Sequence, residues 1–214
     1  MRVLLFTAIL AAGLARQGYA QDGFVAQSGS ALSYNVFDKD GRTFVNPAPD
    51  VSGSPFYKDE WRLGQLILND NRKYDSIRVR LNLSSQEVHI LDKNNTEIAL
   101  ARGYIKEVVW LSDSKVRFVN GFPPVDNQDA NSFYGVLSAG KCWLLESIRK
   151  VVTERKDELS GENKREYSTY EDYYLFDGKA MQRVKKGAAT IDGKPIKFKN
   201  IDDLKKAIDA YNAL

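Results

Sequence analysis

Apolar and polar residues alternate along much of the chain from residue 57 onward. A β-strand points successive side chains to opposite faces, so such alternation predicts a strand with one buried and one solvated face. This pattern is typical of antiparallel sheets. In the clearest run, the apolar positions are Ile77, Val79, Leu81 and Leu83, and the polar positions are Ser76, Arg78, Arg80 and Asn82.

Turn-forming residues separate further segments with a strand-like pattern. Asp177-Gly178 and Asp192-Gly193 place glycine where a tight hairpin turn needs a positive φ. Many short strands at close spacing predict a mainly β fold, an antiparallel sandwich or open barrel with one C-terminal α-helix. The other predicted strands are Arg62–Leu68, Glu87–Leu91, Glu97–Ala101, Ile105–Leu111, Val116–Asn120, Ser132–Leu137, Lys141–Val152, Tyr167–Phe176, Ala180–Val184 and Lys194–Phe198.

The helix is predicted over residues 200–213. Asn200 is suited to accept hydrogen bonds from the first free amides, and the two aspartates that follow at 202 and 203 favour the positive end of a helix. The apolar residues then recur at helical spacing, which predicts that one face packs on the sheet. They are Ile201, Leu204, Ile208 and Tyr211.

Residues 1–20 resemble a signal peptide. Arg2 precedes an apolar run, and Gly18-Tyr19-Ala20 offers small residues for cleavage before Gln21. A retained N-terminal anchor is the alternative. Residues 21–55 read as a tail and a proline-rich linker, with a small hairpin around 38–41, and residues 56–214 as the β-domain. The chain is therefore expected to be exported, to the periplasm or the extracellular space, with no transmembrane span after cleavage.

The net charge of the chain is close to zero. The full chain has 31 Lys and Arg against 28 Asp and Glu; without Arg2 and Arg16 the balance is 29 against 28. A net charge this close to zero argues against a nucleic-acid partner. From Asp177 onward the chain is locally basic, which would suit weak contact with an anionic cell surface. Cys142 is the single cysteine, which excludes an internal disulfide. Because it lies in an apolar segment, we expect its side chain to be buried and to pack as a small apolar group.

Residues 154–166 are mostly charged, with both signs mixed. Because burial of so many charges would carry a large desolvation cost, this segment is expected at the surface. We interpret it as the tip of a long hairpin or as a short solvated helix. A partner-binding arm is the functional alternative.

Sequence tests for catalysis mostly fail. His89 is the only imidazole, it lies in a predicted strand, and no Gly-x-Ser-x-Gly elbow is present, so we expect a strand residue on the polar face. No phosphate-binding Gly-rich loop and no cysteine-based zinc motif occur. The sequence therefore predicts no catalytic residue, no metal ligand and no cofactor.

Aromatic residues are the one enriched feature. Aromatic rings bind sugars by stacking and peptides as apolar anchors, but tyrosine is also common in sheets for packing reasons. Both interpretations stay open. The candidate ligand-binding residues are Tyr57, Trp61, Tyr167, Tyr170 and Tyr173.

The order of elements is similar to that of a family of uncharacterised secreted β-rich proteins from Bacteroidota-type bacteria. The resemblance covers about Gly53 to Leu214 and implies an envelope or extracellular location, with no established activity. Its motifs are Gly53-Ser54-Pro55-Phe56 before Trp61, Gly64, Arg78-Val79-Arg80-Leu81-Asn82-Leu83, Tyr134-Gly135-Val136-Leu137, Gly140-Lys141, Leu144-Leu145, Tyr173-Tyr174-Leu175 and the terminal helix.

Two functions follow as hypotheses. The first is an exported, non-enzymatic β-domain with a binding or structural role in the cell envelope, its partner an unknown envelope component such as a glycan or a protein. The alternative is a carbohydrate-active hydrolase with paired carboxylates beside Tyr170, Tyr173 or Trp61. Such an enzyme needs two acids that face each other across a cleft, about 5–10 Å apart.

Overall fold

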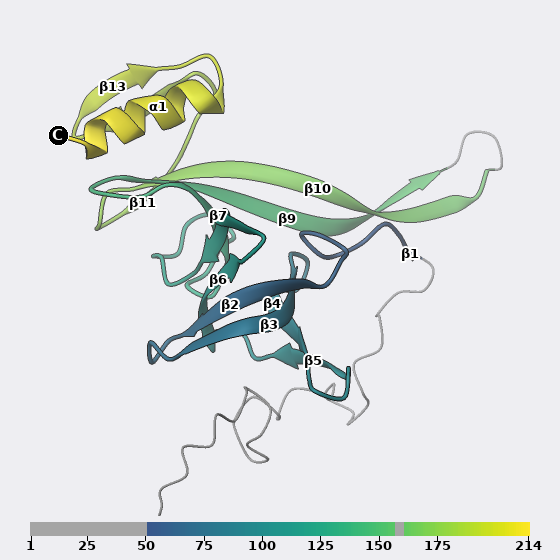
Figure 1. Ribbon diagram of the computed structural model, residues 1–214. Coiled ribbons are helices and arrows are strands. Elements are labelled where there is room, and N and C mark those ends of the chain that lie inside the picture. The colour runs from purple at the N-terminus through teal and green to yellow at the C-terminus, as the bar shows by residue number, and fades with distance from the viewer. Residues whose placement is uncertain (1–50, 157–160) are drawn as a thin grey trace, which may run out of the picture.

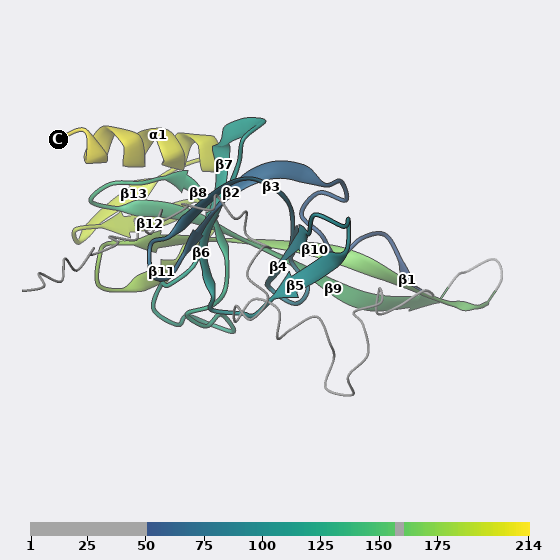
Figure 2. The same cartoon turned by 60° about the horizontal axis from the view of Figure 1, so that its bottom comes forward.

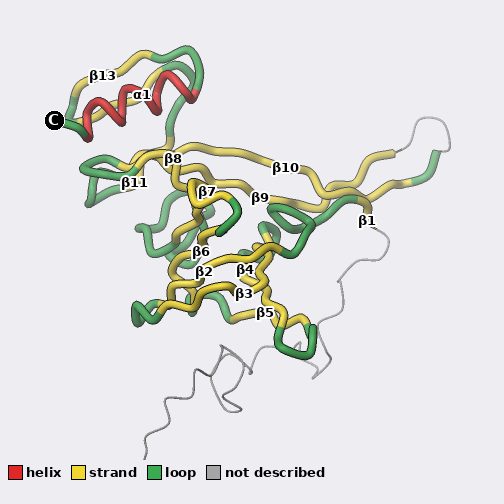
Figure 3. Tube along the Cα trace, viewed as in Figure 1, coloured by secondary structure: helices red, strands yellow, loops and turns green. Residues whose placement is uncertain are grey.

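The computed structural model describes residues 51–156 and 161–214, and strands make up most of this part (Figures 1 and 3). The predicted signal peptide, and all of the predicted tail and linker up to residue 50, lie outside the described residues. The elements are β1 (Val51–Ser52), β2 (Arg62–Leu68), β3 (Lys73–Asn82), β4 (Glu87–Leu91), β5 (Glu97–Leu100), β6 (Ile105–Trp110), β7 (Asp113–Val119), β8 (Tyr134–Ser138), β9 (Trp143–Lys156), β10 (Asn163–Phe176), β11 (Met181–Arg183), β12 (Ala188–Ile191), β13 (Lys194–Lys197) and α1 (Ile201–Asn212).

Eleven strands form one sheet, and β12 and β13 form a separate hairpin. The order along the sheet is β1-β10-β9-β8-β7-β6-β2-β3-β4-β5, and β11 pairs with β10. The pairs are antiparallel except for β1 and β10, which run parallel. The prediction of a mainly β, antiparallel fold with one C-terminal helix is therefore confirmed, and the sheet is open at its ends.

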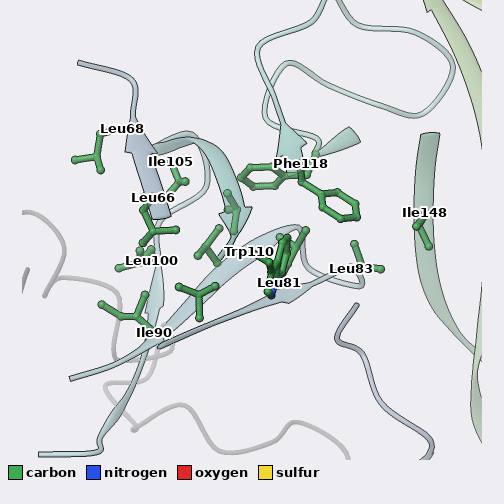
Figure 4. Close-up of a cluster of buried hydrophobic side chains, with 14 residues drawn as sticks. Leu66, Leu68, Leu81, Leu83, Ile90, Leu100, Ile105, Trp110, Phe118 and Ile148 are labelled. Carbon is green, nitrogen blue, oxygen red and sulfur yellow. The ribbon is translucent and has the colours of Figure 1, made fainter. Parts of the chain in front are cut away.

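The sheet curls back on itself. The backbone N–H of Lys150 in β9 donates to the carbonyl of Leu83, directly after β3, at 3.4 Å, although β8, β7, β6 and β2 lie between these strands in the sheet. Sheets twist because of backbone sterics, and over many strands that twist brings distant strands together. The curled part encloses the largest hydrophobic cluster, which strands β2 to β7 line and which Ile148 of β9 completes (Figure 4).

The alternation predicted for residues 76–83 is confirmed. Val79, Leu81 and Leu83 are buried in this cluster, and Ile77 packs against it. His89 lies on the opposite face, paired with Arg80, but it is fully buried. The expectation of a solvated face is wrong here, because the segment before β2 folds over it and places the Phe56 ring 5.1 Å from the imidazole.

The helix follows the sequence prediction closely. The Asn200 side chain accepts a hydrogen bond from the Asp203 N–H at 2.9 Å and so caps the first turn. Leu204 and Ile208 are fully buried, and the helix contacts β8 and β9. It covers a second hydrophobic cluster that also includes the β12–β13 hairpin. In Figure 1, α1 and β13 lie above the β9–β10 pair, and β2, β3 and β4 lie below it.

Strands β9 and β10 form a long ribbon that projects from the body of the molecule (Figures 1 and 2). They pair without a register shift from Trp143 and Phe176 to Lys156 and Asn163. The mixed-charge segment predicted as a hairpin tip is thus partly strand, and only residues 157–160 of it lie outside the described part. The described residues of this segment are exposed except Arg165, which is half-buried, so the charges need no partner in a core.

Two elements were not predicted. Strand β12 is only four residues long, although Ala189 and Ile191 are buried and alternate with exposed residues. Its pairing with β13 depends on the Asp192-Gly193 turn, in which both residues have positive φ (48° and 74°), as the sequence had indicated for Gly193. Strand β1 lies in the proline-rich segment predicted as a linker. It is two residues long, contains no proline and pairs at the sheet edge.

The N-cap of α1 generates the first prediction. Replacing Asn200 by alanine removes the acceptor for the Asp203 N–H, so we expect the free energy of unfolding to fall by about 1 kcal/mol. Urea denaturation at pH 7 measures it. Asn200→Asp is the control, because aspartate caps equally well. A similar loss in both variants would contradict this role.

Candidate functional site

The five predicted ligand-binding residues do not form one site. Tyr57 packs on the large cluster, with its ring centroid 4.8 Å from that of Phe118 and 5.5 Å from that of Trp110. The Trp61 ring lies 4.2 Å from the Arg80 guanidinium carbon. Both aromatics have packing partners inside the protein, the alternative that the sequence left open.

The three tyrosines of β10 divide between two faces of the strand. Tyr167 and Tyr173 share one face, and Tyr170 lies on the other. A Cβ added at Gly53 would lie 3.7 Å from the Cβ of Tyr167, so that residue packs beside the β1 end. Tyr170 is 47% exposed, with its ring 5.9 Å from the Arg149 guanidinium. Tyr173 lines a pocket.

This pocket, called the β10–α1 pocket below, has a volume of about 310 Å³. Three chain segments enclose it: β10, the stretch from β11 to the start of β12, and the connection from β13 into α1. Its lining residues are Glu171, Asp172, Tyr173, Arg183, Val184, Lys185, Lys186, Gly187, Phe198, Lys199, Asn200 and Ile201.

Backbone hydrogen bonds bring the three segments together. The Val184 N–H donates to the Tyr173 carbonyl at 2.7 Å, which holds the chain beside β10 after β11 ends. Gly187 then turns the chain with φ of 75°. The Phe198 N–H donates to the Gly187 carbonyl at 3.3 Å and returns β13 to the pocket. The tight β12–β13 turn therefore places sequence-distant lysines at one opening.

Most of the pocket's charge is positive. Arg183 forms ion pairs with Asp172 and, at 3.9 Å, with Asp126. Lys185, Lys186 and Lys199 are exposed, and their ammonium groups make no ion pair with any residue that the structure describes. The lysine charges are thus available to a ligand, whereas that of Arg183 is used within the fold.

A partly buried carboxylate lies behind the Tyr173 wall of the pocket. The Tyr173 hydroxyl donates to Glu146 Oε1 at 3.2 Å. On its other side Glu146 pairs with Gly135, where an added Cβ would lie 3.4 Å from Glu146 Oε2, so the glycine leaves room for the carboxylate. Burial raises the pKa of Glu146; the hydrogen bond from Tyr173 opposes this shift, and the Glu171 charge adds to it.

The same contact fixes the protonation of the tyrosine. Burial, the Glu146 charge and the hydrogen bond to it raise the pKa of Tyr173 to about 12. At neutral pH the phenol therefore keeps its proton and acts as a donor. A raised carboxyl pKa, as at Glu146, is a property that clusters at functional sites.

The lone histidine belongs to a different cluster, on β3, β4 and β5. His89 Nδ1 lies 2.6 Å from Glu97 Oε1, and Arg80 donates to the same oxygen at 2.8 Å. The Arg80 guanidinium lies between two rings, 3.8 Å from the Phe56 centroid and 4.2 Å from Trp61. Because Phe56 covers the imidazole, this cluster has a structural role: it fastens the segment before β2 to the sheet.

Cys142 lines a second cavity of about 360 Å³, together with Thr190 and Tyr211. The residue is buried, as the sequence predicted. Burial raises the pKa of its thiol to about 11, and the charges of Asp177 and Asp192 add to the shift. A thiol that stays protonated is a poor nucleophile.

In the described ranges 51–156 and 161–214, no group of three or more His, Cys, Asp or Glu side chains could hold a metal ion. Within the same ranges, no helix has the length and apolar character needed to cross a membrane.

Sequence reasoning found Tyr173 and missed the rest of the pocket. The local excess of lysine and arginine after Asp177 was the available signal, but it gave no indication that Lys185, Lys186 and Lys199 converge. Glu146 also has a local signal, since it interrupts the apolar run Trp143-Leu144-Leu145. The residues that Glu146 contacts lie on β8 and β10, far away in the sequence.

Comparison with known proteins returns no matching family model, no matching curated protein and no matching solved structure. The function must therefore be argued from the site itself.

The Glu97 cluster should make stability depend on pH. Partial burial acts to raise the pKa of Glu97, but hydrogen bonds from His89 and Arg80, with their charges, outweigh it and lower the pKa below its ordinary 4.5. The carboxylate therefore stabilises the fold above pH 4.5, and this contribution is lost as the pH falls through the lowered pKa. We expect Glu97→Gln to cost about 1–3 kcal/mol at pH 7 and less below pH 4.5.

Chemical denaturation across this pH range measures the difference. Glu60→Gln is the matched control, because Glu60 pairs with Arg62 at the surface and is 63% exposed. It should change stability by at most about 0.5 kcal/mol. An equal loss in both variants, or a Glu97→Gln loss that does not shrink in acid, would contradict the assignment.

The Glu146 carboxylate should make stability depend on pH in the opposite direction. Because its pKa is raised, the ionised carboxylate costs stability, and this cost develops as the pH rises above the unfolded value of 4.5. Glu146→Gln should be more stable than the wild type at pH 7, by on the order of 1 kcal/mol, with the difference vanishing near pH 4. Thermal unfolding measures it, with exposed Glu166→Gln as control. A destabilised Glu146→Gln at pH 7 would show that the carboxylate is favourably bound.

Proposed function

We propose that this chain is an exported, non-enzymatic β-domain that binds a component of the cell envelope in the β10–α1 pocket. Export is supported by the signal-like residues 1–20, and the resemblance to uncharacterised secreted β-rich proteins is consistent with it. The observation that carries the binding role is the pocket itself. It is a concave site with an aromatic wall, Tyr173, and three lysines without ion-pair partners in the described structure.

Such a lining suits binding. Ligand pockets combine apolar walls with a few polar groups that fix orientation. Tyr173, Val184 and Phe198 supply the apolar surface, and the lysines supply charge. The Tyr173 ring is held in place by its hydroxyl contact with Glu146, so little conformational entropy is lost when a ligand packs against it.

A hydrolase is the second candidate, and one observation favours it. Glu146, with its raised pKa, and Glu171 lie on the same face of the ribbon beside Tyr173. A glycosidase needs an acid of raised pKa and a second carboxylate. Glu146, however, does not line the pocket and is held by the Tyr173 hydroxyl. Binding without turnover is therefore the better-supported function.

The two tyrosines of β10 provide a matched test. We expect Tyr173→Ala to weaken binding of envelope glycans by at least about tenfold in an array screen with the purified protein, since it removes the pocket wall. Tyr170→Ala, on the opposite face, should change binding by less than about twofold. Tyr173→Phe separates loss of the ring from loss of the hydroxyl, and thermal unfolding verifies that each variant folds.

Two results would overturn the proposal. In the first, no envelope component binds, or binding depends equally on both tyrosines. In the second, the purified protein cleaves a bound glycan and Glu171→Gln abolishes the cleavage, which would establish the hydrolase instead.

A further inference from the structure

We propose that the β10–α1 pocket is specific for a saccharide that carries a phosphate or carboxylate group. The inference rests on the proposed binding function and adds the chemical class of the ligand. Around the pocket, Arg183 has acidic partners, whereas the three lysines have none among the residues that the structure describes.

Two acidic residues line the pocket, the exposed Glu171 and the half-buried Asp172, and Asp172 already has partners within the fold. Each oxygen of Asp172 accepts from a different arginine, Oδ2 from Arg149 at 3.2 Å and Oδ1 from Arg183. Arg183 in turn reaches Asp126, which also accepts from the Tyr174 hydroxyl at 2.9 Å. These charges neutralise one another within the fold and leave no carboxylate of this network for the lysines.

The lysine charges therefore remain for a ligand. Lys185 and Lys186 come from the β11–β12 connection, and Lys199 comes from the segment after β13. The bond from the Phe198 N–H to the Gly187 carbonyl holds these two segments side by side, so lysines of both segments can contact one anion. Charges that line a concave surface focus the field and raise the local concentration of an oppositely charged ligand.

The start of α1 is not the source of this preference. Asn200 satisfies one of its free amides from within the chain, and Asp202 and Asp203 place negative charge in the first turn. The anion preference therefore belongs to the lysine side chains, which can be tested by substitution.

The apolar wall indicates that the anion is attached to a ring. Tyr173 and Phe198 offer aromatic surface in the same pocket, and aromatic faces stack on the apolar faces of sugars. A volume of about 310 Å³ is at the small end of ligand pockets and suits one or two sugar units rather than a nucleic-acid backbone. A phosphorylated or acidic sugar can stack on the aromatic rings and place its negative charge beside the lysines.

Calorimetric titration of the purified protein with four probes tests this assignment. The probes are glucose 1-phosphate, glucuronate, neutral glucose and inorganic phosphate. We expect the two anionic sugars to bind at least about tenfold more tightly than glucose and than phosphate alone, with an affinity that falls as salt is added.

Substitutions then locate the site. Replacing Lys185, Lys186 and Lys199 together by alanine should weaken both anionic sugars by about tenfold or more and leave glucose within about twofold. The matched control replaces Lys73, Lys93 and Lys106, which are equally exposed lysines on other elements, and should change no affinity. All six positions are exposed, so both triple variants should fold.

The outcomes separate the two proposals. If Tyr173→Ala abolishes binding but the lysine variant does not, the pocket is correct and the anionic class is wrong. If the control lysines matter as much as the pocket lysines, the preference is nonspecific electrostatics and the inference fails. If no pocket variant changes the binding of any probe or of any envelope glycan, the proposed function itself fails.

The same titration distinguishes two sources of the anionic sugar. Phosphatidylcholine vesicles with and without lipopolysaccharide present the phosphorylated sugar on a lipid, whereas glucose 1-phosphate presents it free. Binding to the lipopolysaccharide vesicles that is lost in the lysine variant assigns a lipid-linked source, and binding to the free sugar alone assigns a soluble one. Binding to plain phosphatidylcholine vesicles would contradict the inference.

Discussion

The three hydrophobic clusters in the described part of the chain meet on strand β9. Leu144 packs in the cluster under α1, Leu145 packs in the cluster around Tyr134 and Tyr174, and Ile148 completes the cluster inside the curled sheet. Leu144 and Ile148 are an even number of residues apart and so lie on the same face of β9. They reach different clusters because the strand twists between them and turns that face in another direction. Each part of the fold is therefore stabilised through one strand. In a chain with one cysteine no disulfide can take this role.

The position of the pocket follows from this arrangement. Strand β10 pairs with β9 along its full length, so its side chains are fixed relative to all three clusters. Tyr173 lies one residue before Tyr174, which is buried in the cluster around Tyr134. The parity of the strand then points Tyr173 to the other face, where the β11–β12 connection and α1 approach it. A pocket wall built on a strand that pairs with β9 on one side and β11 on the other is more rigid than one built on a loop.

Local patterns in the sequence were sufficient for most of the fold, but only for a small part of the site. Strands β2 and β4 match their predicted bounds, and the helix matches in its cap and in its buried stripe, because alternation and helical spacing act over a few residues. Burial of His89 could not be foreseen, since Phe56 covers it from another segment. The convergence of Lys185 and Lys199 depends on a hairpin turn and on backbone bonds between distant segments, which leave no local periodicity.

Three lysines around one pocket repel one another, and a fold gains nothing from that repulsion. The chain contains 28 acidic residues, so partners for these lysines would be easy to supply, as Glu107 is for Arg117 and Glu60 is for Arg62. Isolated lysines on a convex surface carry no such argument, because water solvates each of them at little cost. In this concavity beside two aromatic rings, the three lysines outnumber the remaining carboxylate, Glu171, so a net positive charge is retained against a small loss of stability. In the proposed function, a ligand that brings negative charge would offset that loss, and it would bind beside Tyr173, one of the predicted aromatic residues.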